Sequence, residues 1–573
     1  MTQPCNVAPQ VQFAAPDHTV QQRFSRRNVL KRAGLSVAAL TCADFLGYFA
    51  TFGLPDERRA AGVAKDAAKA GSNPHFLIYW YLEGGWEGYD MFNPVMSPNN
   101  VVNRLSKISD ERYRVLKFGE PGYTLNKEGN LHYGYLAEPG KDLFKDMAIL
   151  SSMHTGGGHS TERLKVHMGS YNLRNTEERE DDERSVMQAF AEVYGQPYVL
   201  PNVSWHWWLS DGELNEVQYT GRRGYYHALG PPHAHTIYAG TPAKLKSFLL
   251  KMQEEAGNTV NREIQHFLDN AHTTFLKDEH IEAVKSYASA REIYMQLAAK
   301  GMKLDRSMLL RLFTDSALRE EFLVQPTDEL ITYRTVNGNK ARSKFSPHAR
   351  VQAMMTYELM RAGLSCAFFI ESRDIRRFDA HRSRGGLWGK DGKTPVGQTD
   401  QTAMMREDLW DPLNTLVKRL KNTEYHGSGK SLFDHCNIVL TSEFGRSIHG
   451  SVDDVLAKKI TDQEREKEIA GQDISAHWKV TSAAFIGSKV KGHSQFGGVG
   501  EKTLMAIPLL PDGTLDPAFD ARTGEQLPGH TPSSQAGIPN HGDVYATALY
   551  LSDIDPKGKG RNDRAPLTYI KRA

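Results

Sequence analysis

Short apolar runs alternate with helical patterns in two parts of the chain. Residues 76–82, 147–151, 366–370 and 437–441 are apolar runs of the length of buried strands. Helical periodicity covers 349–361, where it stops before Gly363, and about 412–421. Strands that are apolar on both faces belong to sheets that are covered on both sides. The pattern therefore predicts an α/β fold with a mainly parallel sheet flanked by helices.

The middle of the chain has a different pattern. From Pro242 to about Leu323 the apolar positions are mostly at helical spacing, with charges between them. We therefore expect 161–345 to be a largely helical insertion or cap between the two parts of the core, 71–160 and 346–573. The aromatic stretch Trp205–Trp208 is compatible with a substrate cap, a partner surface or simple burial under the insertion.

Residues 1–70 are interpreted as an export signal and linker. Arg26 and Arg27 are followed closely by Lys31 and by a run without charge, 33–43. This order is typical of the twin-arginine signal of proteins exported in the folded state, and it predicts a periplasmic or extracellular protein. Asp44 interrupts the apolar run and makes a stable membrane span costly, so membrane contact is expected only through this segment if it stays uncleaved.

Composition excludes several classes of protein. The chain has 70 basic and 68 acidic residues, a net charge of +2, which gives no electrostatic basis for binding nucleic acid. Its four cysteines form no CxxC motif, which argues against a disulfide framework and against haem or iron–sulfur cargo.

Potential metal ligands follow successive predicted strands. In order along the chain they are Glu87 and Asp90, then His154 and His159, then Asp379 and His381, and finally Glu443. In open α/β sheets, ligand groups collect beyond the carboxyl ends of the strands, so these side chains are expected to converge. Carboxylates mixed with imidazoles favour Zn²⁺ or Mn²⁺, with Mg²⁺ or Ca²⁺ as alternatives.

A glycine-rich turn, 156–158, precedes His159, Ser160 and Thr161 and opens a helical stretch that runs toward Gly169. A hydroxyl at a helix N-terminus, beside a metal that lowers its pKa, can attack phosphate or sulfate esters. Ser160 is the candidate nucleophile, although serine and threonine are also ordinary N-caps. Arg446 could neutralise a bound oxyanion or form a structural ion pair.

Four motifs give the chain a resemblance to a known family. They are residues 84–94 (GGWEGYDMFNP), 378–381 (FDAH), 442–447 (SEFGRS) and His477-Trp478 with the following Thr481. They resemble the twin-arginine-exported proteins of domain-of-unknown-function family 1501, which is placed with the alkaline phosphatase and sulfatase superfamily. The resemblance spans roughly residues 75–555 and implies an alkaline-phosphatase-like core.

The resemblance also implies roles for individual residues. Asp379 and His381 look like one ligand pair, and Glu443 takes the place of the aspartate in an Asp-His pair. Phe444 stands where the superfamily has the histidine of that pair. The remaining equivalences are His477 as a late histidine ligand, Asp90 or Glu87 as the first-strand carboxylate, and Ser160 at the position of the nucleophile.

The expected function is that of an exported, metal-dependent hydrolase of phosphate or sulfate esters. Its substrate would be a small anionic ester or an envelope polymer. The alternative is a non-catalytic binding or scaffolding protein of the cell envelope, with a protein partner, on the same fold. Metal content separates the two, because a scaffold does not need a complete metal site.

Replacing Arg26 and Arg27 by lysine should keep the protein in the cytoplasm, because the exporter recognises the arginine pair and not positive charge in general. Immunoblotting of cytoplasmic and periplasmic fractions measures the result. Replacing Arg58 and Arg59, a second arginine pair downstream of the apolar run, by lysine is the matched control and should leave export unchanged. Export of the Arg26,Arg27 variant at the wild-type level would contradict the interpretation.

Overall fold

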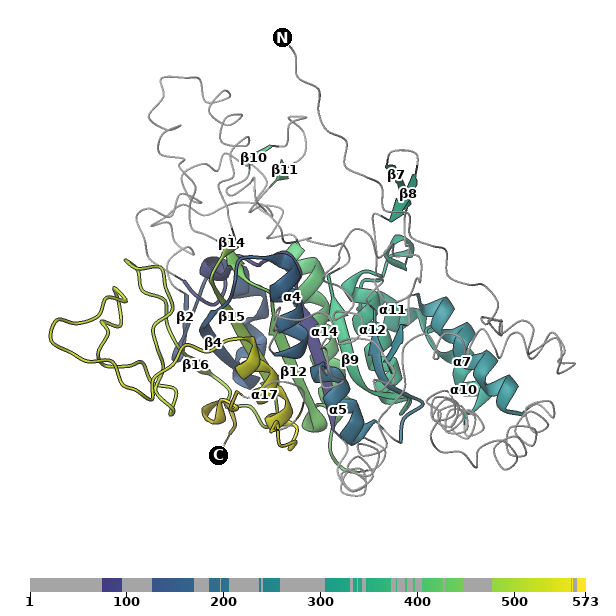
Figure 1. The fold of residues 1–573 in the computed structure, drawn as a ribbon. Coiled ribbons are helices and arrows are strands. Elements are labelled where there is room, and N and C mark those ends of the chain that lie inside the picture. The colour runs from purple at the N-terminus through teal and green to yellow at the C-terminus, as the bar shows by residue number, and fades with distance from the viewer. Residues whose placement is uncertain are drawn as a thin grey trace, which may run out of the picture. The chain divides into compact units, whose positions relative to one another are not determined.

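A central sheet organises the part of the chain that the computed structural model describes (Figure 1). Within that part the sheet has eight strands, and all of them run in the same direction except β15. The fold is therefore α/β with a mostly parallel sheet, as the sequence predicts. The described residues are 75–94, 126–169, 185–195, 197–205, 236–238, 241–257, 304–329, 333–336, 339–342, 347–372, 378, 387–388, 395–396, 404–425, 428–446, 477–557, 559 and 564–572.

The strands of the main sheet have a mixed sequence order. Across the sheet they are β16 (Ser494–Phe496), β4 (Met147–His154), β15 (Val480–Gly487), β12 (Cys436–Thr441), β1 (Phe76–Tyr81), β9 (Ser365–Glu371), β5 (Leu200–Ser204) and β6 (Thr236–Tyr238). Four small two-stranded sheets pair β2 (Asn126–Glu128) with β3 (Leu131–Tyr133), β7 (Tyr333–Val336) with β8 (Asn339–Arg342), β10 (Leu387–Trp388) with β11 (Pro395–Val396), and β13 (Gly445–Arg446) with β14 (His477–Trp478).

The described helices connect and cover these strands. The α-helices are α4 (His159–Met168), α5 (Val186–Tyr194), α7 (Pro242–Gly257), α10 (Arg306–Arg311), α11 (Ser316–Glu321), α12 (Ala349–Arg361), α14 (Asp411–Asn422) and α17 (His541–Leu551). The 3₁₀ or π-helical segments are η1 (Gly88–Asp90), η4 (Tyr135–Asp146), η7 (Pro326–Glu329), η8 (Arg406–Trp410), η9 (Leu432–His435) and η10 (Thr568–Ile570).

The long apolar and periodic segments are predicted correctly. The four apolar runs form β1, β4, β9 and β12, and the helical pattern at 349–361 coincides with α12. Gly363 follows α12 with a φ of +64°, a left-handed conformation that favours glycine and ends the helix.

The predicted insertion boundaries are partly wrong. Strands β5 and β6 lie within 161–345, yet they pair in parallel with β9 and with each other at one edge of the main sheet. Helix α5 also packs on β9. The core therefore includes these parts of the expected insertion, and the described segments between Thr241 and Glu329 are helical. Trp205, directly after β5, is buried in the core. Residues 1–70, 206–208, Asp379 and His381 lie outside the described residues.

Strand β1 is covered on both faces by different helical segments. The hydroxyl of Tyr79 donates to the carbonyl of Val166 in α4 at 3.1 Å. The indole of Trp80, the next residue, donates to the carbonyl of Asp408 in η8 at 3.1 Å. Successive side chains of a strand point to opposite faces, so α4 and η8 lie on opposite sides of the sheet. Figure 1 shows α4, α5 and α17 together on the near side.

Helix α4 buries a polar face against the sheet. His159, Arg163 and His167 are spaced at i, i+4 and i+8, and all three are buried. The imidazole of His167 contacts the rings of Tyr81 and Phe369, with centroid distances of 5.7 and 4.4 Å. A helix that buries charged and titratable groups differs from the usual apolar helix–sheet contact, and each of these groups needs compensation from the core.

The turn after β1 requires glycine at position 85. Gly85 has a φ of +83°, and a Cβ atom built on it would lie 2.5 Å from the ring of Phe444. Gly85→Ala should therefore lower the free energy of unfolding by about 1–3 kcal/mol, through backbone strain and displacement of that ring. Gly158→Ala is the matched control, because Gly158 has a φ of −118° and its added Cβ meets no atom within 4 Å. Urea denaturation should show a change below about 1 kcal/mol for this control, and equal losses for both variants would contradict the analysis.

The burial of His167 predicts a loss of stability at acidic pH. Burial, together with the charges of Arg163 and His541, lowers the pKa of His167 to about 3, whereas an unfolded histidine has a pKa of about 6.5. Below that pH the unfolded chain binds a proton that the folded protein excludes, so the free energy of unfolding falls as the pH decreases. At ~1.4 kcal/mol per pKa unit, the loss from this group is about 2 kcal/mol between about pH 7.5 and pH 5.

Urea denaturation at these two pH values measures the loss. His167→Phe should remove this part of the pH dependence, since phenylalanine does not titrate, whereas the control His530→Gln, at an exposed position, should keep it. His167→Gln provides the same comparison if the larger ring is not accommodated. A wild-type and a His167→Phe protein with the same pH dependence would contradict the assignment.

Candidate functional site

The carboxyl ends of three central strands lie at the same level. Tyr81 of β1 is in register with Thr441 of β12 and with Glu371 of β9. The loops that follow therefore begin side by side. Strand β15 is antiparallel to β12 and β4, so its first residue, Val480, lies at this same edge. Residues that follow the parallel strands and residues that precede β15 therefore lie at the same edge of the sheet.

Glu443 lies at the centre of this edge, two residues after β12, and is fully buried. Its Oε1 atom accepts hydrogen bonds from the backbone N–H of Gly84 at 2.8 Å and from Nδ1 of His159 at 2.9 Å. Its Oε2 atom accepts one from the hydroxyl of Tyr81 at 2.9 Å. Burial acts to raise the pKa of Glu443, but the hydrogen bond and charge of His159, with the charge of Arg163, outweigh it and hold the pKa below its ordinary value.

His159 is the first residue of α4, and Gly158 occupies the N-cap position without a side-chain hydrogen bond. Ser160 and Thr161 are therefore the second and third helical residues. Neither is the N-cap, which corrects the interpretation of one of them as an ordinary N-cap. Their position places them in the first turn, where backbone N–H groups lack intrahelical acceptors. The contact between His159 and Glu443 brings this helix start to the end of β12.

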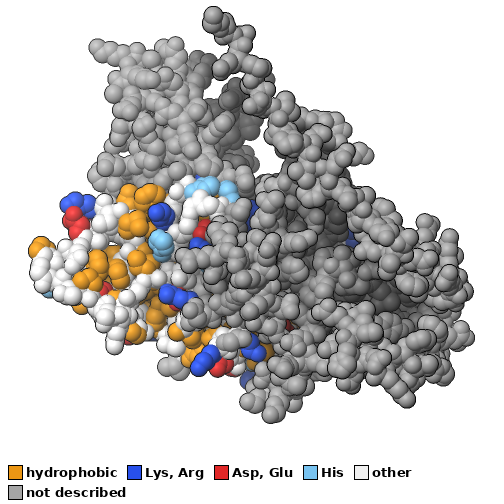
Figure 2. Space-filling model, in the orientation of Figure 1, with side chains coloured by type: hydrophobic (Ala, Val, Ile, Leu, Met, Phe, Trp, Pro, Cys, Tyr) orange, Lys and Arg blue, Asp and Glu red, His pale blue; other side chains and the backbone are white. Residues whose placement is uncertain are grey.

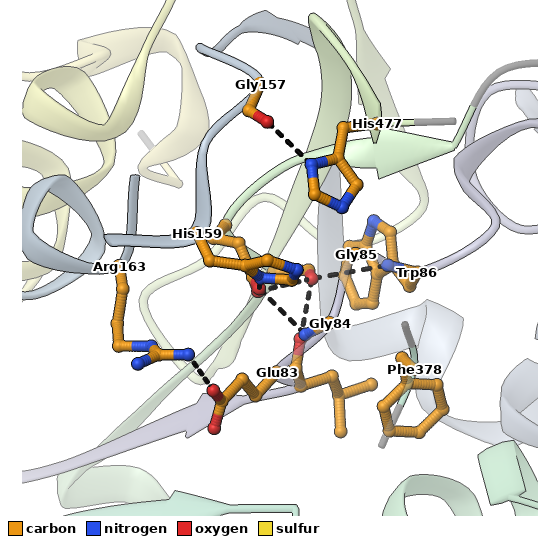
Figure 3. A network of polar contacts seen from close by, with 12 residues as sticks. Glu83, Gly84, Gly85, Trp86, Gly157, His159, Arg163, Phe378 and His477 are labelled. Atoms are coloured by element: carbon orange, nitrogen blue, oxygen red, sulfur yellow. Dashed lines mark hydrogen bonds and ion pairs between the residues drawn. The ribbon is translucent and has the colours of Figure 1, made fainter. Parts of the chain in front are cut away.

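His477 reaches the site through strand pairing. It forms β14 with Trp478, and in the register of β13 and β14 it lies opposite Arg446. Its Nδ1 atom is 2.6 Å from the carbonyl oxygen of Gly157. Its ring stacks on Phe444 at 4.1 Å and meets the ring of His159 edge-on at 4.5 Å. Figure 3 shows the two imidazoles close together above the turn formed by Gly84 and Gly85.

A second buried carboxylate was not identified from the sequence. Glu83 follows β1 by two residues and pairs with the guanidinium of Arg163, and both side chains are almost inaccessible. The backbone N–H of Glu83 donates to the hydroxyl of Ser372, which directly follows β9, at 3.2 Å. Glu83 has the same relation to β1 that Glu443 has to β12. The rule that ligand groups collect beyond the carboxyl ends of strands could therefore have identified Glu83, had we applied it to the residues directly after the predicted strand.

Arg446 occupies a structural position in the described contacts. Its side chain is fully buried, and its guanidinium donates to the backbone carbonyls of Gly84, Gly85 and Phe378. These bonds fix the turn after β1 against the end of β12. The described hydrogen bonds of Arg446 therefore hold the protein backbone, and its binding of an oxyanion stays a prediction.

The structure brings together only some of the expected metal ligands. His159, His477 and Glu443 meet, and Glu87 is buried in the loop after β1, where Asp90 ends η1. His154, the last residue of β4, is exposed. Among the described residues, no three histidine, cysteine, aspartate or glutamate side chains are grouped so that they could hold a metal ion. Asp379 and His381 are not among those residues.

The described surface gives little indication of a partner. On the face shown in Figure 2, apolar side chains alternate with charged and polar ones. The large apolar side chains that the structure describes as exposed are Leu310 and Leu323, each about half accessible. Within the described ranges, no helix combines the length and the apolar character that a membrane span requires.

Comparison with known proteins adds no assignment to this geometry. The chain matches no family model, no curated protein and no solved structure.

Proposed function

We propose that the protein is an exported, metal-dependent hydrolase of phosphate or sulfate esters with an alkaline-phosphatase-like core. The observation that carries this proposal is the hydrogen bond between His159 and Glu443. It joins the start of α4, with its candidate nucleophile Ser160, to the carboxyl edge of the sheet. The resemblance to family 1501 of the alkaline phosphatase and sulfatase superfamily motivates the choice of reaction.

The electrostatics of the helix start suit an anionic substrate. The first turn of α4 presents backbone N–H groups and the positive end of the helix dipole. Gly157 and Gly158, which precede the helix, are exposed, so an ester group can approach the turn from solvent. An oxyanion bound there would be stabilised by the first-turn N–H groups of the helix.

The residues present are compatible with a divalent ion. Two imidazoles, His159 and His477, come from different elements and meet within 4.5 Å, and imidazole nitrogen suits Zn²⁺ or Mn²⁺, with Mg²⁺ or Ca²⁺ favoured only if oxygen ligands dominate. By resemblance, Asp379 and His381 would complete the site. When bound, such an ion would lower the pKa of an adjacent hydroxyl and stabilise negative charge on oxygen.

In this scheme the protein's own groups perform three tasks. Ser160 supplies the oxygen that attacks phosphorus or sulfur, and its proton passes to solvent. The bond from phosphorus or sulfur to the ester oxygen breaks, and the alcohol leaves after taking a proton from solvent. Water then hydrolyses the phosphorylated or sulfated serine and restores the hydroxyl. The first-turn N–H groups of α4 hold the nonbridging oxygens. The buried ionised carboxylate of Glu443 fixes His159 and thereby the position of the helix start.

The twin-arginine signal suggests where the enzyme acts and on what. A protein delivered to the periplasm or beyond would meet small anionic esters or envelope polymers that carry phosphate or sulfate groups. Neither nucleic acid nor a membrane is needed as a partner under this proposal, apart from the signal segment itself. The alternative, a non-catalytic envelope protein that binds a partner protein, predicts no ester turnover in any assay.

Ser160→Ala should abolish hydrolysis of an aryl phosphate or aryl sulfate, with a loss of about 10³-fold or more in kcat, because it removes the attacking oxygen. Metal content, measured by elemental analysis, and the urea unfolding curve should remain those of the wild type. The chromogenic product gives the rate directly.

Ser185→Ala is the matched control. Ser185 caps α5 by accepting from the N–H of Gln188, so its loss should cost about 1 kcal/mol of stability and leave turnover unchanged. Retained activity in Ser160→Ala would remove Ser160 as the nucleophile. A wild-type protein that binds metal but hydrolyses no ester would favour the envelope-binding alternative.

A further inference from the structure

The carboxylate of Glu443 is already engaged by donors of the protein. The N–H of Gly84 and Nδ1 of His159 share Oε1, and the hydroxyl of Tyr81 binds Oε2. All of these atoms are buried among aromatic side chains and strand ends. A metal ion bound to Glu443 would have to compete with them, and each displaced donor would lose its acceptor inside the protein.

The hydrogen bond to Glu443 identifies the nitrogen of His159 that acts as donor. An ionised carboxylate can only accept, so His159 donates its Nδ1–H. When the ring is neutral, its lone pair then resides on Nε2, which is the nitrogen left to bind metal. Metal-binding histidines commonly donate their other N–H to a carboxylate or to a backbone carbonyl, which orients the ring.

His477 donates its Nδ1–H to a backbone carbonyl, as His159 donates to a carboxylate. The carbonyl oxygen of Gly157 accepts a hydrogen bond from Nδ1 of His477 at 2.6 Å, so Nε2 is the nitrogen of this ring that is left to bind metal. The ring of Phe444 stacks on His477 and also contacts His159, at centroid distances of 4.1 and 4.9 Å. Two imidazoles in the same tautomer are therefore held together by a carboxylate, a carbonyl and an aromatic ring.

We propose that His159 and His477 bind the divalent ion through their Nε2 atoms, and that Glu443 is the acceptor that orients His159 and is not itself a ligand. This inference rests on the metal dependence in the proposed function. It differs from the role that the family resemblance implies for Glu443, which is that of a direct carboxylate ligand. Phe444 then has a positioning role in place of the histidine expected by resemblance.

Zinc titration of the exported, metal-stripped protein against a chromophoric chelator tests the assignment. Glu443→Gln keeps an oxygen that can accept from His159 but removes the charge, so affinity should fall about 10–100-fold while the number of bound zinc ions at saturation is unchanged. His159→Ala and His477→Ala should each lose more affinity than Glu443→Gln, because they remove a ligand. His530→Ala, at an exposed position outside the site, should bind zinc like the wild type.

X-ray absorption of the zinc-loaded wild type counts the imidazole ligands without any substitution. It therefore tests the assignment even if the Glu443→Gln protein does not fold. At least two imidazoles are expected. Fewer than two, or a Glu443→Gln variant that loses zinc as completely as His477→Ala, would overturn the inference. Failure of the proposed function appears separately, as intact zinc binding without ester turnover, whereas turnover that persists without zinc would overturn only the metal assignment.

Discussion

The rest of the site depends on the buried ionic face of α4. His159 and Arg163, one helical turn apart, pair with Glu443 after β12 and with Glu83 after β1. Breaking a buried charge pair by removing one partner typically costs about 3–5 kcal/mol, because the remaining charge has no water around it. The two carboxylates and the two cationic or polar partners are therefore fixed as a set. Helix α4 cannot shift along the strand ends without losing both contacts.

This constraint links the fold to the chemistry of the site. The position of the α4 N-terminus is set by His159, and the orientation of His159 is set by the ionised carboxylate of Glu443. Glu443 is in turn held by Tyr81 and by the backbone of Gly84 at the end of β1. A helix start, a histidine and a carboxylate are thus positioned by strands that are adjacent in the sheet. Preorganisation of this kind is what stabilisation of an oxyanion requires.

The sequence predicts the parts of the molecule that depend on local pattern. Continuous apolar runs predicted β1, β4, β9 and β12. The expectation that ligand groups collect beyond the carboxyl ends of strands correctly placed His159 near Glu443. Strands β5 and β6, at one end of the strand order, were missed because they are short. The arrival of His477 depends on the antiparallel direction of β15 and on pairing with β13, which no local pattern encodes. The backbone acceptors of Arg446 likewise become visible only when three distant loops are assembled.

Phe444 contributes an apolar ring to a site that is otherwise built from polar groups. By resemblance, a ligand is missing at this position, and a direct two-residue ligand pair with Glu443 is absent. In the structure the phenyl ring stacks on His477, contacts His159 and occupies the space that Gly85 leaves open. An apolar ring cannot bind an ion, but it excludes water from one side of both imidazoles and limits their rotation. The neighbouring carboxylate of Glu443 accepts from His159. Under the proposed metal site, Phe444 would therefore position the two imidazoles and Glu443 would orient His159, so neither residue would bind the ion itself.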